Sequence, residues 1–346
     1  MERKFKCAIV GATGAVGREM LRCILQYNFP YESIKCLASK RSVGKVLEQD
    51  GQKFVVEELT ENSFEGVEVA FWSAGGSISA KYMEYAVKAG CVNIDNTSYF
   101  RMDPNCPLVV PEVNAYALKD HHGIIANPNC TTIIMASALN RLDEEFDIQR
   151  ITVSTYQAVS GAGVAGMTEL YEQSRAYLAG EEVKCNTLPC ASDKKHYQIA
   201  FNAIPQVDKF DLTNGYTKEE LKMVNETKKI FNKDIEVNAT CVRIPVLRGH
   251  SESVTIETKK PIDMDKVFDL LAHSHGVHLC DDIANQVYPM AIDFIGDELV
   301  HVGRVRKDLY RDNVLSMWIV GDQLMKGAAY NSIDIGNKMI EMGLLK

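Results

Sequence analysis

The sequence predicts an α/β protein of two domains, in which a Rossmann-type, doubly wound parallel sheet is followed by a second, α+β domain. Its 346 residues, 46% of them hydrophobic, can bury a core larger than that of one typical domain. A glycine-rich turn joins an apolar strand to a helix within residues 7–25, and strand and helix patterns then alternate up to residue 126. Such alternation indicates a parallel sheet that is covered by helices.

The composition argues against several classes of partner. The net charge is −8 and there is no long basic run, so we expect neither nucleic acid nor an anionic membrane as a partner. No apolar stretch approaches the roughly 18 residues of a membrane-spanning helix, and residues 1–6 lead into a strand without a signal-peptide cleavage region. The ten cysteines lack CxxC spacing, so we expect no disulfide framework, no metal site and a reducing, cytoplasmic location.

The turn Gly11-Ala12-Thr13-Gly14-Ala15-Val16-Gly17 stands between a strand at 7–10 and a helix at 18–25. Its spacing is GxxGxxG, whereas the commonest dinucleotide sites have GxGxxG, and a glycine turn can simply join a strand to a helix. Its place after a first strand nevertheless favours binding, because glycines there let the backbone approach a pyrophosphate. We therefore expect a dinucleotide to contact Gly11, Thr13, Gly14, Ala15 and Val16.

The residues after the next strand indicate which dinucleotide binds. The strand at 34–38 ends in Ser39-Lys40-Arg41-Ser42. NAD sites usually place an acidic residue here to hold the ribose 2′-hydroxyl, whereas NADP sites place arginine near the 2′-phosphate. No acid is present, and a phosphate could accept hydrogen bonds from this segment, although a solvated basic loop would have the same sequence. The pattern favours NADP, with Arg41 and Ser42 as contacts.

Cys130 follows the last strand of this predicted sheet. Further strands are expected at 67–74, 91–95, 108–110 and 124–126, with a helix at 79–89. Ligands of such sheets bind at the carboxyl ends of the strands. Asn127-Pro128-Asn129 indicates a turn and residues 131–142 a helix. Cys130 thus falls at a helix N-terminus, where N–H groups and the dipole favour a thiolate. A free cysteine is more often a buried structural residue, so the nucleophile remains a hypothesis.

The second half supplies candidate partners for Cys130. A strand at 151–159 carries Gln157 and meets the glycine turn 160–163, and an amphipathic helix is expected at 217–231. His250 is the best acid–base candidate, because a general base needs a pKa near neutrality. Arg243 precedes it by seven positions, so on one regular strand the two would lie on opposite faces. If both serve one site, Gly249 must mark a bulge or bend.

A histidine cluster near the C-terminal third is a weaker candidate. His273, His275 and His278 stand close together and could suggest a metal site. No acidic or cysteine ligand completes a recognised spacing, and Gly276 breaks the helical register. A polar helix end is the better interpretation.

Together these motifs resemble those of aspartate-β-semialdehyde dehydrogenases. The resemblance covers nearly the whole chain in the expected order, so it is far more specific than the glycine turn alone. It is carried by the segments 11–17, 127–132, 156–163, 199–206, 243–246, 249–250 and 326–329.

The resemblance implies a role for each of several residues. Cys130 would be the acylated nucleophile, His250 the acid–base residue, and Gln157 would orient the thiohemiacetal and contact the substrate. Arg243 would hold the substrate α-carboxylate through a bidentate pair. The remaining implied contacts are phosphate at Arg101 and Lys222, the substrate ammonium group at Glu219 or Glu220, and the cofactor at Ser160, Gly161 and Gln323. Glu219 is preferred over Glu220, because it lies three residues from Lys222 and shares its helix face.

The implied reaction is the reversible, NADPH-dependent reduction of L-4-aspartyl phosphate to L-aspartate 4-semialdehyde and phosphate through a cysteine thioester. It would serve the biosynthesis of lysine, diaminopimelate, methionine and threonine. The implied architecture is an NADP-binding domain at 1–128, a catalytic and homodimerisation domain at 129–322, and a segment at 323–346 whose helix, 323–342, returns to the first domain.

Three other functions stay open on sequence grounds. N-acetyl-glutamyl-phosphate reductase has similar chemistry, but its cysteine typically follows His-Pro-Gly where this chain has Asn127-Pro128-Asn129. A non-phosphorylating aldehyde dehydrogenase would not need the phosphate ligands. A non-catalytic NADP-binding redox sensor would explain Cys130 but leave the remaining site residues without roles.

Overall fold

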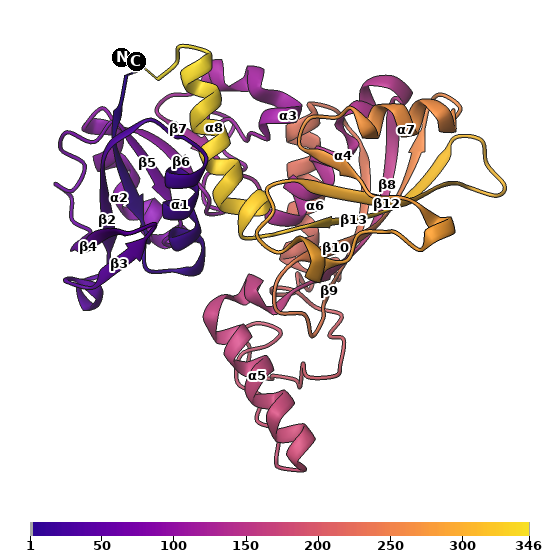
Figure 1. The fold of residues 1–346 in the computed structure, drawn as a ribbon, viewed down its shortest axis with the longest axis horizontal. Helices are drawn as coiled ribbons and strands as arrows, with labels where there is room; N and C mark the ends of the chain where they lie inside the picture. Colours follow the sequence, from indigo (N-terminus) through magenta and orange to yellow (C-terminus); the bar gives the residue numbers. More distant parts are fainter. Residues whose placement is uncertain (1–2, 346) are drawn as a thin grey trace. The chain divides into compact units, whose positions relative to one another are not determined.

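The computed structural model describes residues 3–345 and divides into two compact units (Figure 1). The first consists of Met1–Asn129 with Gly327–Lys346, and the second of Cys130–Lys326. The chain therefore leaves the first unit immediately before Cys130 and re-enters it after Lys326.

The first unit is built on a seven-stranded sheet with the strand order β3-β4-β2-β1-β5-β6-β7. From β1 the chain moves outward through β2 to β4 and then crosses to β5, β6 and β7 on the other side, so the sheet is doubly wound, as predicted. All neighbours are parallel except β3 and β4, which form an antiparallel hairpin that the sequence patterns did not reveal. The strands are β1 (Phe5–Val10), β2 (Tyr31–Ala38), β3 (Val46–Gln49), β4 (Gln52–Glu58), β5 (Val69–Trp72), β6 (Val92–Asp95) and β7 (Ile124–Ala126).

The strand expected at 108–110 does not form. Only Leu108 makes an isolated bridge, to Ala126. Pro107 precedes it and Pro111 begins α3 (Pro111–Asn114) directly afterwards, and proline can neither donate to a ladder nor continue a strand. The segment is therefore too short to add a strand.

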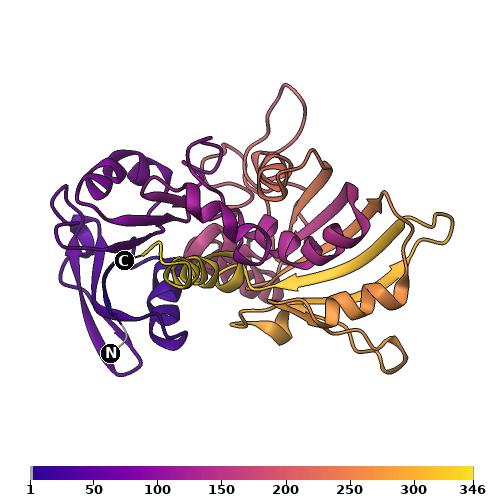
Figure 2. The same ribbon diagram turned by 90° about the horizontal axis from the view of Figure 1, so that it is seen from above.

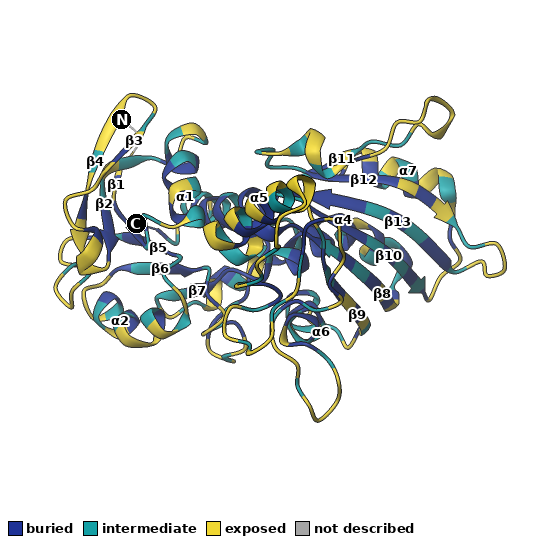
Figure 3. Ribbon diagram, turned by 90° about the horizontal axis from the view of Figure 1, so that it is seen from below, coloured by how far each residue is buried: buried dark blue, intermediate teal, exposed yellow. Residues whose placement is uncertain are grey.

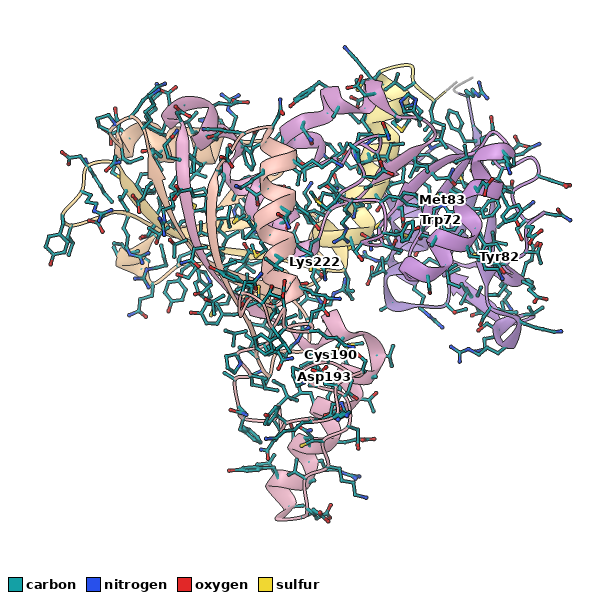
Figure 4. All side chains as sticks on the ribbon, turned by 180° about the vertical axis from the view of Figure 1, so that it is seen from behind. Trp72, Tyr82, Met83, Cys190, Asp193 and Lys222 are labelled. Carbon is teal, nitrogen blue, oxygen red and sulfur yellow. The ribbon has the colours of Figure 1, made fainter. Side chains whose placement is uncertain are left out.

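Helices complete the first unit. α1 (Ala15–Gln26) and α2 (Gly76–Lys88) follow β1 and β5, and Trp72, Ala86 and Met83 belong to one buried apolar cluster (Figure 4). α8 (Tyr330–Glu341) contacts α1, α3 and β6, so the C-terminal helix does return to the first unit. The side-chain amide of its Asn331 donates to Asn127 Oδ1 at 2.6 Å.

The returning helix starts two residues later than the expected Gln323. A π-helical turn at Met325–Ala329 precedes α8. Asp322 Oδ1 accepts hydrogen bonds from the backbone N–H groups of Leu324 and Met325, at 2.9 and 3.3 Å. An acidic side chain that caps these N–H groups defines a helix start, which explains the later beginning.

The second unit contains a mixed six-stranded sheet of order β11-β12-β13-β10-β8-β9. β8 and β9 are parallel, as are β11 and β12, and the other neighbours are antiparallel. The strand expected at 151–159 corresponds to β8, whereas β9, β11, β12 and β13 were not predicted. The strands are β8 (Ile148–Gln157), β9 (Glu236–Arg243), β10 (His250–Thr258), β11 (Val277–Leu279), β12 (Val300–Lys307) and β13 (Val314–Gly321).

One face of this sheet is covered by helices. α4 (Cys130–Phe146) contacts β8, β10, β12 and β13, while α6 (Lys218–Phe231) and α7 (Met264–Ala272) flank it (Figure 2). Their apolar side chains and those of the strands form one buried core, and the strands are largely buried (Figure 3). α5 (Gly163–Ala179), which was not predicted, extends away from the sheet (Figure 1).

Helix ends agree with local chemistry. His273 is the C-cap of α7, in line with the polar helix end expected for the histidine cluster. Among residues 3–345, no helix combines the length and the apolar character that a bilayer crossing requires.

The hydrogen bonds at the N-terminus of α6 should stabilise the fold. Thr217 and Glu220 form a capping box: the Thr217 side chain accepts from the Glu220 N–H, and the Glu220 carboxylate accepts from the Thr217 N–H at 2.6 Å. We expect Thr217→Ala to lower the free energy of unfolding by about 1 kcal/mol, because one buried N–H loses its acceptor. Urea unfolding measures this. Lys218→Ala, at the exposed next position, is the control; equal stability of the two variants would contradict the capping role.

Candidate active site

The pairing register of four strands brings residues that are distant in sequence together where these strands end, in the second unit. β8 and β9 are parallel and end together, with Gln157 opposite Arg243. β10 runs antiparallel to β8 and begins at that same edge with His250, which pairs with Gly321 at the end of β13. Arg243, Gln157, His250 and Gly321 therefore form one row across the sheet, on the face that α4 covers.

The connection between β9 and β10 makes this row possible. β9 ends at Arg243 and β10 starts at His250, so the two residues belong to neighbouring chain ends and not to one strand. Gly249 has φ 92°, a left-handed conformation that other residues rarely adopt, so the expected bend is present. The Gly249 N–H donates to Gln323 Oε1 at 2.9 Å, and the Gln323 amide donates in turn to the Ser160 hydroxyl.

His250 is held as a neutral imidazole. Its side chain is fully buried, and its Nδ1 accepts a hydrogen bond from the Ala158 N–H at 3.1 Å. Burial lowers the pKa of His250 to about 3, and the nearby Arg243 charge adds to this effect. The pKa near neutrality on which the expected acid–base role depended is therefore not found, because the ring is removed from solvent beside a cation. Because Nδ1 accepts, the neutral ring carries its proton on Nε2, which lies 3.4 Å from Gln157 Nε2.

Arg243 presents an unsatisfied donor. Its guanidinium is buried, and Nη1 donates to the Ala158 carbonyl at 2.6 Å. Nε has no hydrogen-bond partner among the described residues. A Cβ on Gly161 would come within 2.9 Å of Arg243 Nη1, so a side chain there would displace the guanidinium, whereas its distance of 3.7 Å from His250 Cε1 is an ordinary contact. A buried cation with a free donor is suited to bind an anion.

Gln157 connects the row to α6. The Thr155 hydroxyl donates to Gln157 Oε1, and Gln157 Nε2 donates to Glu219 Oε1, both at 3.1 Å. Lys222 Nζ donates to Glu219 Oε2 and to Asp208 Oδ2, each at 3.0 Å (Figure 4). Burial alone would lower the pKa of Lys222, but the attraction of the two carboxylates outweighs it and raises the pKa. Lys222 is therefore a cation.

The two glutamates at the start of α6 have different surroundings. Glu220 bonds the Thr217 N–H and, through Oε1, the Cys241 N–H at 2.9 Å, so both of its oxygens satisfy backbone groups. Glu219 instead contacts Gln157 and Lys222. The arrangement supports the choice of Glu219 over Glu220 as the site carboxylate.

Cys130 is the first residue of α4 and is partly exposed. Ile134, one turn later on the same helix face, packs so closely on Gly321 that a Cβ there would lie 2.7 Å from Ile134 Cγ1. Since Gly321 pairs with His250, the first turn of α4 lies over the row of Arg243, Gln157, His250 and Gly321. The charge of Cys130 interacts with the Arg243 guanidinium.

Other cysteines lack these conditions. Burial raises the pKa of Cys7 and of Cys36 to about 12, and raises the pKa of Cys91 and Cys241 further. Such thiols stay protonated at neutral pH. Helix-start position, partial exposure and a nearby cation combine at Cys130, which favours a thiolate there.

The first unit has its own cavity, of about 530 Å³, at the carboxyl ends of β1, β2, β4 and β5. Gly11, Thr13, Gly14 and Arg41 line it, together with Lys40. Ala15 and Val16 form the first turn of α1, whereas Ser42 is buried and does not line the cavity. Sequence reasoning missed the lining residues Glu58, Ser73, Ile78 and Tyr82.

The cavity has the features of a dinucleotide site. A Cβ on Gly17 would lie 2.2 Å from the Gly11 carbonyl oxygen, so α1 packs on the turn more closely than any side chain allows. This close packing directs the N-terminus of α1 at the turn, and helix N-termini attract phosphate. Lys40 and Arg41 add positive charge at the end of β2.

Arg101 belongs to the first unit. Its side chain is buried, and it donates from Nε to the Asn127 carbonyl at 3.0 Å and from Nη2 to the Asn96 carbonyl at 2.9 Å. These bonds fix the guanidinium beside the segment that leads into Cys130.

Two family models match the chain. One, described as "Semialdehyde dehydrogenase, NAD binding domain", matches residues 6–121, and the other, "Semialdehyde dehydrogenase, dimerisation domain", matches 139–326. The aspartate-semialdehyde dehydrogenase of Bacillus subtilis is 51% identical over all of both chains, and that of Campylobacter jejuni is 49% identical over 99% of each.

The chain belongs to the aspartate-semialdehyde dehydrogenase family.

A solved structure agrees with this assignment. The crystal structure of aspartate semialdehyde dehydrogenase II from Vibrio cholerae, complexed with ASA, has a TM-score of 0.93 to this chain. It is 44% identical and covers 98% of this chain and 99% of its own. Membership of the aspartate-semialdehyde dehydrogenase family confirms the resemblance on which the sequence interpretation depended, and it does not favour the reductase or redox-sensor alternatives.

The state of His250 can be tested directly. We expect its imidazole to remain neutral from pH 8 down to pH 5, because burial and Arg243 place its pKa near 3, below this whole interval. The Cε1–H proton resonance, assigned by its loss in His250→Asn, should therefore keep a constant chemical shift. A shift with a midpoint above about pH 6 would show an ordinary histidine and contradict the prediction.

Proposed function

We propose that this protein reduces L-4-aspartyl phosphate to L-aspartate 4-semialdehyde and phosphate with NADPH, reversibly, through a thioester on Cys130. The row of Arg243, Gln157, His250 and Gly321 is called the catalytic row from here on. The observation that carries the proposal is that this row holds a neutral His250 and a buried Arg243 with an unsatisfied Nε, and that the N-terminus of α4 lies over it. The reaction belongs to the biosynthesis of lysine, diaminopimelate, methionine and threonine from aspartate.

NADP is the cofactor we propose for the cavity of the first unit. The glycine turn accommodates a pyrophosphate, and Arg41 with Lys40 is placed to contact a 2′-phosphate at the end of β2. We assign contact with the nicotinamide of NADP to Ser160, Gly161 and Gln323. Gln323 bonds both the Ser160 hydroxyl and the Gly249 N–H, next to His250. When bound, NADP supplies the hydride acceptor in the oxidative direction.

Substrate recognition follows from the charges of the second unit. The Arg243 guanidinium, with its free Nε, would bind the α-carboxylate of the substrate. The Glu219 carboxylate would hold the ammonium group, since its position is fixed by Gln157 and Lys222. A ligand that carries both charges satisfies both groups at once.

The chemistry starts at Cys130. Its thiolate attacks the aldehyde carbon, and the carbonyl oxygen becomes an alkoxide. His250 donates its Nε2–H to this oxygen, and the neutral ring keeps its proton, because a fixed donor stabilises an oxyanion without proton transfer. Gln157 holds the adduct beside the ring. Loss of hydride from the alkoxide carbon leaves the Cys130 thioester.

Release of the acyl group needs phosphate. A phosphate oxygen attacks the thioester carbon, a second alkoxide forms on the oxygen that faces His250, and its collapse expels the Cys130 thiolate. We assign phosphate binding to Arg101 and Lys222. Lys222 is held as a cation by Glu219 and Asp208, so it can attract an anion without losing its proton.

Two further features complete the proposal. We propose a homodimer in which a second copy covers the groove of about 760 Å³ lined by Tyr288, Ile292, Ile295 and Trp318, because Ile292 and Ile295 are otherwise exposed. We also propose a cytoplasmic location, since Cys130 must stay a reduced thiol to act as a nucleophile.

One assay tests the function. NADPH formation from aspartate semialdehyde is followed with and without inorganic phosphate, and with NAD in place of NADP. The proposal requires turnover that depends on phosphate and is faster with NADP. Turnover without phosphate would identify a non-phosphorylating aldehyde dehydrogenase instead.

The nucleophile is tested by Cys130→Ala. We expect kcat to fall at least about a thousandfold, because no thioester can form, while NADP affinity measured by fluorescence titration changes little. Cys190→Ala is the matched control, since this partly exposed cysteine contacts the Ser192 hydroxyl and belongs to none of the site contacts described above. Turnover of Cys130→Ala within tenfold of the parent protein would refute the assignment.

The carboxylate clamp is tested by Arg243→Ala. Loss of the charged hydrogen bonds should weaken substrate binding by about 3 kcal/mol, which corresponds to a rise in KM or a fall in kcat/KM of roughly a hundredfold. The affinity for NADP should change far less. Arg243→Lys, which keeps the charge but not the planar pair of donors, should be intermediate. Arg150→Ala, at the far end of β8 in an exposed pair with Glu236, is the control. Equal losses for substrate and cofactor would argue against the clamp.

A further inference from the structure

A second row of side chains lies directly beneath the catalytic row. Because side chains alternate along a strand, residues two positions on point to the same face. The register places Cys241 opposite Thr155, Thr155 opposite Glu252, and Glu252 opposite Ile319. Glu252 is thus the next residue after His250 on the face covered by α4.

The third row closes this face with an apolar layer. Val254, one step beyond Glu252, belongs to the buried core together with its neighbours Val153 and Met317. Glu252 therefore stands between the catalytic row and a hydrophobic core. Its side chain is fully buried, and neither carboxyl oxygen has a hydrogen-bond partner among the described residues.

Among the described residues, no cation forms an ion pair or a hydrogen bond with Glu252. Burial raises the pKa of Glu252 well above its ordinary value, and the neighbouring Glu219 carboxylate on α6 raises it further. From β9, two titratable side chains lie on this face: Cys241, a buried thiol in the same row, and Arg243, a buried cation one row away in the row of His250. β13 carries no titratable residue, and the nearest titratable group on β10 itself is the neutral His250.

The remaining strand and helix offer no counter-ion either. On β8, Arg150 lies at the opposite end in an exposed pair with Glu236. On α4, the charged residues stand in the last turns, where Asp143 pairs with Lys233. Burying a carboxylate without a paired cation costs far more free energy than burying the uncharged carboxylic acid.

Glu252 can act on the site through Thr155 and through charge. Thr155, its neighbour on β8, donates its hydroxyl to Gln157, which in turn donates to Glu219. The site already holds the Glu219 carboxylate, and it must accept the Cys130 thiolate and an anionic substrate. A second carboxylate one row below would oppose both of these anions.

We propose that Glu252 is a positioning residue that supports the catalytic row as an uncharged carboxylic acid, and that loss of its proton at alkaline pH weakens substrate binding. This inference rests on the proposed function. In the uncharged state the second row adds no charge beneath His250, so Arg243 remains available to the substrate. In the ionised state, the Glu252 carboxylate attracts the Arg243 guanidinium and repels the substrate carboxylate that this guanidinium would bind.

The protonation state is measured first, on the free protein. Infrared difference spectra between pH 7 and higher pH should contain the carbonyl stretch of a protonated carboxylic acid, and Glu252→Gln should remove that band. Should Glu252→Gln fail to fold, Glu252→Asp supplies the assignment, because it displaces the band and does not delete it. This measurement needs no substrate, so its result is independent of the proposed reaction.

The functional consequence is measured by pH profiles of KM and kcat for aspartate semialdehyde. In the parent protein, KM should rise in the pH interval in which the infrared band disappears, with kcat changing much less. In Glu252→Gln, which cannot ionise, this rise should move up by at least about one pH unit. Glu169→Gln, at a buried carboxyl of α5 that bonds Gln173, is the control and should keep the parental profile.

Two outcomes would overturn the inference. One is the absence of a protonated-acid band at pH 7, which would show that Glu252 is ionised in the resting protein. The other is an alkaline rise in KM at the same pH in the parent protein and in Glu252→Gln. A parent protein that does not turn over aspartate semialdehyde would refute the proposed function and leave the infrared result standing.

Discussion

The register of β9, β8, β10 and β13 is the constraint on which the candidate active site depends. It places Arg243, Gln157, His250 and Gly321 in one row at the sheet edge, although they are distant in sequence. Gly321 then admits Ile134 of α4, which brings the helix start with Cys130 over that row. A shift of one residue in any of these strands would turn its site residue to the opposite face.

Burial determines the electrostatics of this row. Burial favours the uncharged forms of His250 and Glu252, whereas Lys222 keeps its charge because two carboxylates contact it. The proposed mechanism uses a fixed donor and an anion-binding cation and requires no proton transfer to or from His250. The buried Arg243 with its free Nε and the Nε2–H of His250 satisfy these needs without rearrangement.

Local sequence signals predicted the parts of the structure that depend on neighbouring residues. The turn at Pro128 predicted that Cys130 begins a helix, and strand–helix alternation predicted the doubly wound sheet. The strand expected at 108–110 failed because two flanking prolines limit it. The roles of Asp208, Thr155 and Glu252 had no local signal, since each follows from contacts with residues of other elements.

The sequence by itself determined the strand–helix alternation of the first unit, the glycine turn, the order of the motifs and hence the family, because these depend on short-range sterics and periodicity. Only the tertiary structure decided which side chains share an edge, that Glu219 and not Glu220 reaches Gln157, and that His250 is neutral with its proton on Nε2. Those properties arise from strand pairing, from the bend at Gly249 and from removal of water. They are long-range effects that no single segment of the chain contains.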